Sequence, residues 1–161
     1  MDNDKILAKS AQSVQKALSQ KGLSCKVIEL SASTRTAEEA AAALRCGIAQ
    51  IVKSLIFKTK VSHKPILVLA SGSNRVSEKT IEDYVGEKIT KADADFTRQV
   101  TGFAIGGIPP VGHTHVLDTF IDKDLLSFED VWAAAGTPHA VFNLKGSDLL
   151  SLTNGKVVSV K

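Results

Sequence analysis

The sequence has little of the chemistry that marks secreted, metal-binding or membrane proteins. Its 161 residues include two cysteines, Cys25 and Cys46, which are far apart and form no CxxC pair. This spacing predicts neither a disulfide framework nor a zinc site. No apolar stretch approaches the length of a membrane span, and the polar, acidic N-terminus is unlike a signal peptide. We therefore expect a cytoplasmic protein with reduced cysteines and no contact with a membrane.

Excess charge of one sign is also scarce, because 20 Lys and Arg residues are balanced by 17 Asp and Glu residues. The net charge of +3 permits contact with a nucleic-acid backbone but does not demand it, and no basic run forms a polybasic arm. The hydrophobic fraction of 43% predicts a buried core rather than disorder. We expect a single domain over residues 1–161.

Periodic apolar residues, helix caps and turn residues divide the chain into short elements. Helices are expected from a cap within Asp2–Asp4 up to Gly22, and then over 36–45, 77–84, 94–101, 128–135 and 147–153. Strands are expected over 25–30, 53–58, 66–70, 116–121 and 138–144, with a last edge strand over 157–160. The 66–70 run is apolar throughout, which is typical of a central strand with both faces covered. The predicted fold class is α+β (α/β-like), with a central mixed β-sheet flanked by helices.

The densest cluster of glycine and proline lies at residues 102–113, which read GFAIGGIPPVGH. Proline lacks a backbone donor and glycine permits positive φ or close approach, so this segment cannot be a regular element. Because the segment is apolar, we expect a packed loop that forms one wall of a pocket; a turn that only packs is the alternative. Residues 107–114 have the spacing of a nucleotide-binding loop. His113 replaces its lysine and two prolines remove donors, which argues against an NTPase.

Lys53 places a charge within the apolar run IVKSLIF of residues 51–57. Burying an ammonium is costly unless it is paired or takes part in chemistry. Three alternatives remain open: a lysine that reaches the solvent, a buried ion pair, and a functional group.

His113 and His115 would lie on one face of a strand, but no third ligand is evident, so no metal site is predicted. Asn74 follows the expected central strand, where α/β sheets place ligands.

The segments that carry a resemblance to a known family are residues 34–36, 50–57, 70–76, 92–96, 101–113 and 135–142. In this order they resemble the YbaK/EbsC family, also called the prolyl-tRNA synthetase associated domain. The match runs from about residue 21 to the end of the sequence. Its most specific parts are Lys53 within its strand and the loop of the Gly-Gly-x-Pro-x-Gly type.

Members of that family hydrolyse the ester bond of wrongly charged tRNA, either as free-standing proteins or as an insertion in prolyl-tRNA synthetase. The resemblance implies an aminoacyl-tRNA deacylase that uses Lys53 as its catalytic residue and needs no metal or organic cofactor. The implied partners are the acceptor end of a mischarged tRNA and, in a transient complex, a synthetase. With no synthetase sequence on either side, the chain looks like the trans-acting kind.

The candidate substrate-binding residues lie in the Gly/Pro loop and at the ends of neighbouring elements: Thr36, Ser71, Gly72, Asn74, Gly106, Gly107, Ile108, Pro109, Pro110, Gly112, His113 and His139. Gly107→Val is expected to harm activity more than stability, because a Cβ would intrude on the pocket or strain the backbone. The role of Lys53 stays open between the terminal phosphate, the oxyanion and the amino group. The edited amino acid is open among Ala, Cys, Ser and Thr, and a non-catalytic module that binds tRNA or an aminoacyl derivative is the alternative function.

Overall fold

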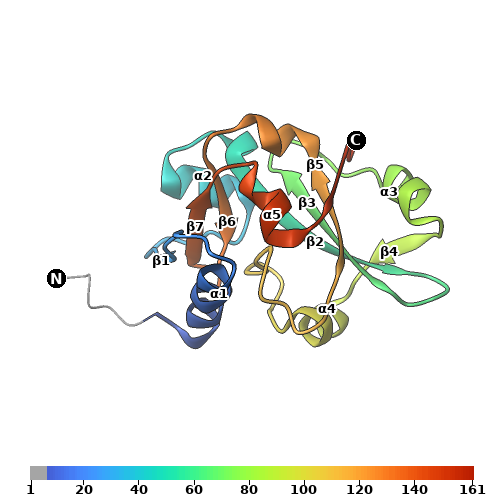
Figure 1. Ribbon diagram of the computed structural model, residues 1–161, viewed down its shortest axis with the longest axis horizontal. Coiled ribbons are helices and arrows are strands. Elements are labelled where there is room, and N and C mark those ends of the chain that lie inside the picture. The colour runs from blue at the N-terminus through green and yellow to red at the C-terminus, as the bar shows by residue number, and fades with distance from the viewer. Residues whose placement is uncertain (1–6) are drawn as a thin grey trace.

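A mixed, eight-stranded β-sheet organises the chain in the computed structural model, which describes residues 7–161 (Figure 1). Along the sheet the strands follow the order β1-β7-β6-β2-β3-β5-β8, and β4 pairs with β2 off this path. The strands are β1 (Ile28–Glu29), β2 (Ile51–Thr59), β3 (Pro65–Ser71), β4 (Ile89–Lys91), β5 (Asp118–Asp122), β6 (Val131–Ala134), β7 (Ala140–Leu144) and β8 (Lys156–Val158). The pairs β2·β6, β3·β5 and β5·β8 are parallel and the others are antiparallel, which confirms the predicted mixed sheet.

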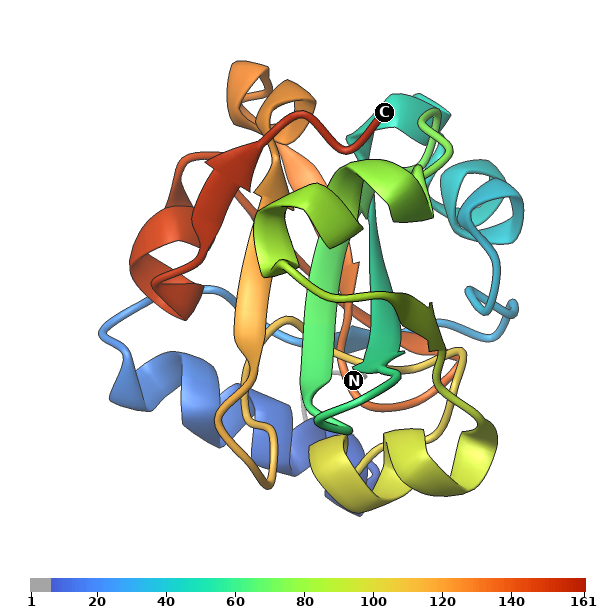
Figure 2. The same cartoon turned by 90° about the vertical axis from the view of Figure 1, so that its right-hand side faces the viewer.

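The central strand β3 is covered on both faces, as its continuous apolar sequence predicts. Figure 2 shows β3 between β2 and β5, with helix α3 packed across one face. Leu67 and Leu69 point into the larger core, whereas Val68 and Ala70 point into a second core on the opposite face. Successive residues of a strand face opposite sides of the sheet. Because a core covers each side of β3, all four side chains are fully buried.

Helices flank the sheet on both faces (Figure 1). They are α1 (Lys9–Gln20), α2 (Ala37–Leu44), α3 (Glu78–Val85), α4 (Ala94–Thr101) and α5 (Asp148–Thr153), with 3₁₀ turns η2 (Ile48–Gln50) and η3 (Lys123–Ser127). Helix α1 buries Ala11, Val14 and Leu18 in the larger core, and α3 buries Ile81 in the second. None of these helices within residues 7–161 has the length and apolar character that crossing a membrane requires.

Capping residues fixed three helix starts that the sequence predicts. Thr36 forms a reciprocal capping box with Glu39 at the start of α2. Ser77 and Asp93 accept hydrogen bonds from the first turns of α3 and α4. Helix α1 begins at Lys9, and the proposed cap at residues 2–4 lies outside the described residues.

Sequence reasoning was wrong about residues 128–135, which were expected to form a helix. Val131 and Ala133 are buried with more exposed neighbours between them, and the segment forms strand β6 between β2 and β7. The alanines favour a helix locally, but pairing with strands that are distant in sequence decides the outcome.

Strand β4 was not predicted, and β1 spans two residues instead of six. Strand β5 begins only at Asp118, where its pairing with β3 starts, and Val116, the expected first residue, is 99% exposed.

Candidate active site

The candidate site lies at a gap along one edge of β2. At this edge β6 pairs with Ile51 and Val52, and β4 pairs from Phe57 onward. Between these pairings, the backbone N–H of Ala92 donates to Ile56 O. Within the described part of the chain, no strand therefore pairs with residues 53–55 on this side, although β3 pairs with them on the other.

The backbone of Ser54 faces this gap. Antiparallel pairing directs the backbone groups of alternate residues to the same side. Ile51 O accepts a hydrogen bond from Gly72 on the β3 side, whereas Ile56 O accepts from Ala92 on the gap side. Ser54 lies two residues before Ile56 in the strand, so its N–H and C=O point to the same side as those of Ile56, away from β3. Its Oγ is buried and has no hydrogen-bond partner among the described residues.

A cavity of about 420 Å³ occupies the gap. Residues before and within α2 form one side, and Trp132 and its neighbours in β6 form another. The Gly/Pro loop forms a third wall through Ile105, Gly106 and Ile108. The volume lies within the range of small-ligand sites, which spans roughly 300–1,000 Å³.

Lys53 projects from β2 at this cavity and is half-buried. Its Nζ donates a hydrogen bond to the backbone oxygen of Asn74, at 2.6 Å. Burial lowers the pKa of the Lys53 ammonium, and the carboxylates of Glu38 and Asp122 partly oppose this shift. Among residues 7–161, no carboxylate lies within ion-pair distance of Lys53. The structure therefore disfavours the alternative of a buried ion pair.

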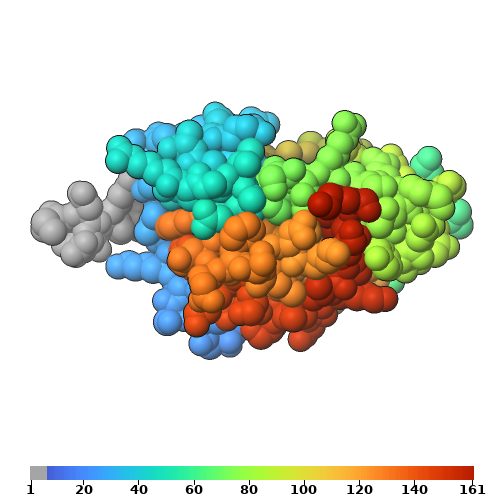
Figure 3. Space-filling model, turned by 90° about the horizontal axis from the view of Figure 1, so that it is seen from above, coloured from blue at the N-terminus to red at the C-terminus, as the bar shows by residue number. Residues whose placement is uncertain are grey.

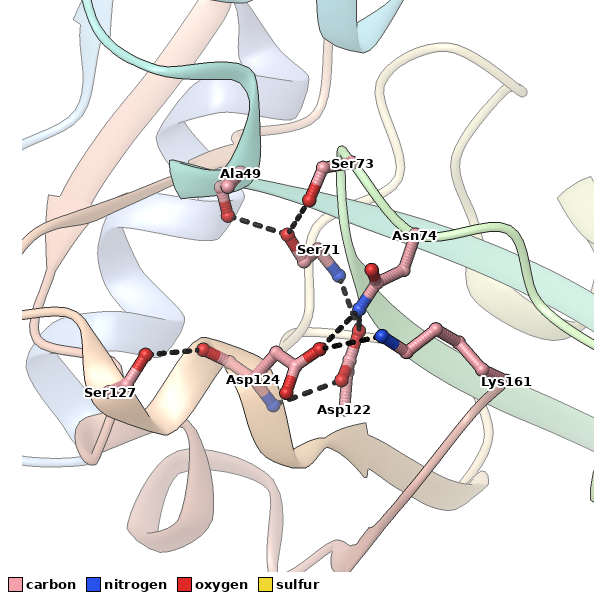
Figure 4. Close-up of polar contacts among 8 residues, drawn as sticks. All are labelled: Ala49, Ser71, Ser73, Asn74, Asp122, Asp124, Ser127 and Lys161. Carbon is pink, nitrogen blue, oxygen red and sulfur yellow. Dashed lines mark hydrogen bonds and ion pairs between the residues drawn. The ribbon is translucent and has the colours of Figure 1, made fainter.

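The acceptor of Lys53 belongs to a turn that a buried carboxylate holds (Figure 4). Asp122, at the end of β5, is 1% exposed. Its Oδ2 accepts from the backbone N–H of Ser71 at 3.0 Å and from Asn74 Nδ2 at 2.8 Å. Its Oδ1 accepts from the backbone N–H of Asp124 at 3.0 Å. Sequence reasoning missed Asp122; the available signal was a carboxylate that ends the apolar strand TFID.

Among the predicted substrate-binding residues, the structure brings four to the cavity beside Lys53: Thr36, Gly72, Gly106 and Ile108. Ser71 and Asn74 lie in the adjacent turn and do not line the cavity. The remaining candidates are also absent from its lining: Gly107, Pro109, Pro110, Gly112, His113 and His139. The cavity also has walls that the sequence did not single out, among them Arg35, Glu38, Ile105 and Trp132.

The ring nitrogens of both candidate histidines, His113 and His139, form hydrogen bonds with backbone oxygens. His113 Nε2 lies 2.6 Å from Pro109 O within the same loop. Burial lowers the pKa of His113, and this hydrogen bond opposes the shift in part. His139 Nδ1 lies 3.0 Å from Ala32 O at the surface. Nowhere in residues 7–161 are three or more His, Cys, Asp or Glu side chains grouped to hold a metal ion.

The structure corrects the reason for glycine at position 107. A Cβ there would lie 2.8–2.9 Å from the backbone of Thr137, and Gly107 O accepts from the N–H of Gly136. Gly107 therefore permits close approach of two loops rather than access to the cavity, and its φ is not positive. Gly106 differs, because its φ is +99° and its α-carbon faces the side chain of Arg35 at the cavity.

A sequence model described as the aminoacyl-tRNA editing domain matches residues 31–152, the greater part of the chain. The chain belongs to this family. All residues that line the cavity lie within the matched range of the editing domain, whereas α1 precedes it.

Relatives of this editing domain include a protein of its own length and part of a synthetase. Uncharacterized protein YwhH of Bacillus subtilis (strain 168) is 28% identical over 148 residues, which cover 92% of this chain and 94% of YwhH. A proline–tRNA ligase of Limosilactobacillus fermentum is 31% identical over 94 residues, which cover 56% of this chain and 16% of the ligase.

Solved structures share the architecture of the editing domain. A proposed trans-editing enzyme for prolyl-tRNA synthetase is 45% identical, with a TM-score of 0.91 and coverage of 97% of this chain and 99% of that one. Hypothetical protein APE2540 is 27% identical, with a TM-score of 0.86 and coverage of 92% and 98%.

Proposed function

We propose that this editing domain is an aminoacyl-tRNA deacylase, which hydrolyses mischarged tRNA in trans in the cytoplasm. The observation that carries the proposal is the half-buried Lys53 ammonium at the cavity. One of its N–H groups is committed to Asn74 O, which leaves two for a ligand. An ammonium at a small-ligand cavity suits a substrate that carries or develops negative charge.

The reaction requires little chemistry from side chains, because an aminoacyl ester is already activated. A water oxygen attacks the ester carbon, negative charge develops on the former carbonyl oxygen, and the bond to the ribose oxygen then breaks. The proton lost by the water ends on the ribose hydroxyl, so the products are a free amino acid and uncharged tRNA. Orienting the water, or the adjacent ribose hydroxyl, and stabilising the oxyanion supply the main rate enhancement.

Lys53 is proposed as the catalytic residue that stabilises this oxyanion. The alternative contact, with the terminal phosphate, would strengthen ground-state binding instead. The two roles separate kinetically, because loss of an oxyanion contact lowers kcat whereas loss of a phosphate contact raises KM.

Four cavity residues are proposed to position the aminoacyl end: Thr36, Gly72, Gly106 and Ile108. Ser54 adds a strand edge whose backbone N–H and C=O are directed into the gap. Such an edge can accept from the α-amino group of the substrate and donate to a carbonyl, as an added strand would. Ser71 and Asn74 are proposed to act from the neighbouring turn rather than by contact with the substrate.

The proposed partner is the acceptor end of a mischarged tRNA, and a synthetase in transient contact is a second one. The similarity to part of a proline–tRNA ligase and to a proposed trans-editing enzyme for prolyl-tRNA synthetase supports both. A non-catalytic module that binds tRNA is the competing function.

A deacylation panel tests the proposal. Purified protein is mixed with proline tRNA that carries Ala, Cys, Ser or Thr. Proline tRNA that carries proline serves as the matched control. We expect faster ester loss than in buffer for at least one mischarged species. Binding of tRNA with no ester cleaved above the background rate would establish the non-catalytic module instead.

A further inference from the structure

Among residues 7–161, the Lys53 ammonium has one hydrogen-bond acceptor, and that acceptor is a backbone oxygen in a turn. Asn74 O lies in the segment after β3, where Asn74 N–H donates to Ser71 O at 2.9 Å. A turn of this kind holds its carbonyl in place only if other contacts fix it, because loops have more conformational freedom than the strands they join. The position of Lys53 Nζ therefore depends on what anchors residues 71–74.

Asp122 supplies that anchor from a strand. One of its oxygens accepts from both ends of the turn, the Ser71 N–H and the Asn74 side-chain amide. The other oxygen accepts from the Asp124 N–H, so both oxygens are used as acceptors. No cation lies within ion-pair distance of Asp122 among the described residues, and its charge is met by these three N–H donors.

A second, weaker clamp reaches the same turn from the surface. Asp124 Oδ2 accepts from Asn74 Nδ2 at 2.8 Å and lies 3.5 Å from Lys161 Nζ. Figure 3 shows the green turn after β3, the orange η3 segment and the dark red C-terminal segment gathered on one face of the molecule. Asp124 is more exposed than Asp122, so water can replace it as an acceptor.

We infer that Asp122 is a positioning residue for Lys53, acting by holding the Ser71–Asn74 turn so that the Asn74 carbonyl fixes the ammonium at the cavity. The inference rests on the proposed role of Lys53. Asp122 does not line the cavity, so it acts through the turn and not by contact at the cavity.

The substitution Asp122→Asn is a selective way to break this anchor. It preserves shape, but an amide NH₂ replaces one acceptor oxygen and then faces an N–H donor. The buried donor left without a partner destabilises the turn. Two carboxylates act on Lys53 through charge, Glu38 from α2 and Asp122 from β5. Glu38→Gln therefore removes a comparable charge without touching the turn, and Asp118→Asn changes an exposed carboxylate at the other end of β5.

The experiment is a double-mutant cycle in steady-state deacylation kinetics with Lys53→Ala and Asp122→Asn. We expect Asp122→Asn to lower kcat on the order of 10- to 100-fold with little change in KM, because displacement of a catalytic group by about 1 Å has this scale of effect. The double variant should be no slower than Lys53→Ala alone, because Asp122 acts through Lys53. Asp118→Asn should match the wild type, and Glu38→Gln should lower kcat less than Asp122→Asn does.

Additive losses in the cycle would overturn the inference, since a general structural defect reduces activity whether or not Lys53 is present. Equal losses in Glu38→Gln and Asp122→Asn would also overturn it, in favour of charge alone. Should Asp122→Asn fail to fold, Asn74→Ala removes the hydrogen bond between the Asn74 side chain and Asp122 while it keeps the backbone carbonyl that accepts from Lys53. This variant should show the same lowered kcat. Wild-type kcat in Asn74→Ala would then refute the inference.

A readout without activity separates this inference from the proposed function. Exchange of the Ser71 amide hydrogen should accelerate in Asp122→Asn but not in Asp118→Asn, and a crystal structure should show Lys53 Nζ displaced from Asn74 O. If the wild-type protein cleaves no ester but these changes occur, the proposed function fails and the anchor stands. If the wild type is active and neither change occurs, the anchor fails alone.

Discussion

The two halves of the Gly/Pro loop differ in what surrounds them. Ile105 is exposed at the cavity mouth, and Gly106 follows it along the same wall. From Pro109 to Val111 the chain is buried, and Val111 packs in the larger core. Ile108 lies at the junction, because it both lines the cavity and belongs to that core. One glycine- and proline-rich motif thus shapes a cavity with its first half and anchors itself in the core with its second.

The largest effect is expected at Lys53, which lines the same cavity as the first half of the loop. Lys53→Ala should slow turnover about 10²-fold or more, the scale of a lost oxyanion donor. The melting temperature should change little, because Lys53 is only half-buried and its truncation removes a single hydrogen bond, the one to Asn74 O. Single-turnover deacylation beside a melting curve measures both quantities. Lys53→Arg is the matched variant and should not restore turnover, because a planar guanidinium cannot replace a compact ammonium. Normal turnover in Lys53→Ala would remove it from the proposed site.

Gly107→Val tests the junction between the two halves. The added Cβ meets the Thr137 backbone, which cannot rotate away, so the free energy of unfolding should fall by about 1–3 kcal/mol. Activity should fall together with stability as the loop is displaced. Chemical denaturation measures the loss. Gly106→Ala is the contrast, because the atoms nearest its Cβ belong to the flexible Arg35 side chain, although its positive φ adds strain. Unchanged stability in Gly107→Val would show that the two loops separate easily.

A pair of alanine substitutions separates the two halves directly. Val111→Ala removes two methyl groups from the core and should lower the free energy of unfolding by about 2 kcal/mol with a small effect on turnover per folded molecule. Ile105→Ala should leave stability nearly unchanged and raise KM, because it removes apolar surface at the cavity mouth. Melting curves and deacylation kinetics on both variants measure the contrast. The distinction fails if the two variants show the same profile.

The smallest expected effect is the pH dependence of the buried half. Burial lowers the pKa of His113 below its usual value of 6.5, so the unfolded chain binds the proton more readily than the folded protein. Protonation of His113 therefore favours the unfolded chain. The free energy of unfolding is at its full value above about pH 6.5 and decreases as the pH falls toward the folded pKa, by at most about 1.4 kcal/mol per pH unit. Melting curves between pH 5 and 8 measure this decrease. His113→Gln cannot titrate and should show a flatter dependence; an equally steep one would assign the effect to other groups.

Local sequence rules predicted much of the fold and part of the site. The capping residues Thr36, Ser77 and Asp93 placed their helices within one or two residues, because a cap acts on its own first turn. Lys53 stood out as a charge in an apolar run. The gap beside it did not, because it depends on where β6 and β4 pair with β2.

Asp122 and the division of the loop were beyond prediction for the same physical reason. Nothing near Asp122 in the sequence distinguishes it from other carboxylates that end strands, and the two donors that tie it to the turn, on Ser71 and Asn74, lie about fifty positions earlier. Likewise, glycine at 107 is explained by Thr137, which is thirty residues away. The sequence by itself determined the apolar periodicities, the helix caps and the motifs that resemble the family, all of which act over a few residues. Only the tertiary structure decided which groups meet at the cavity, because contacts between distant segments arise when the sheet brings their strands together.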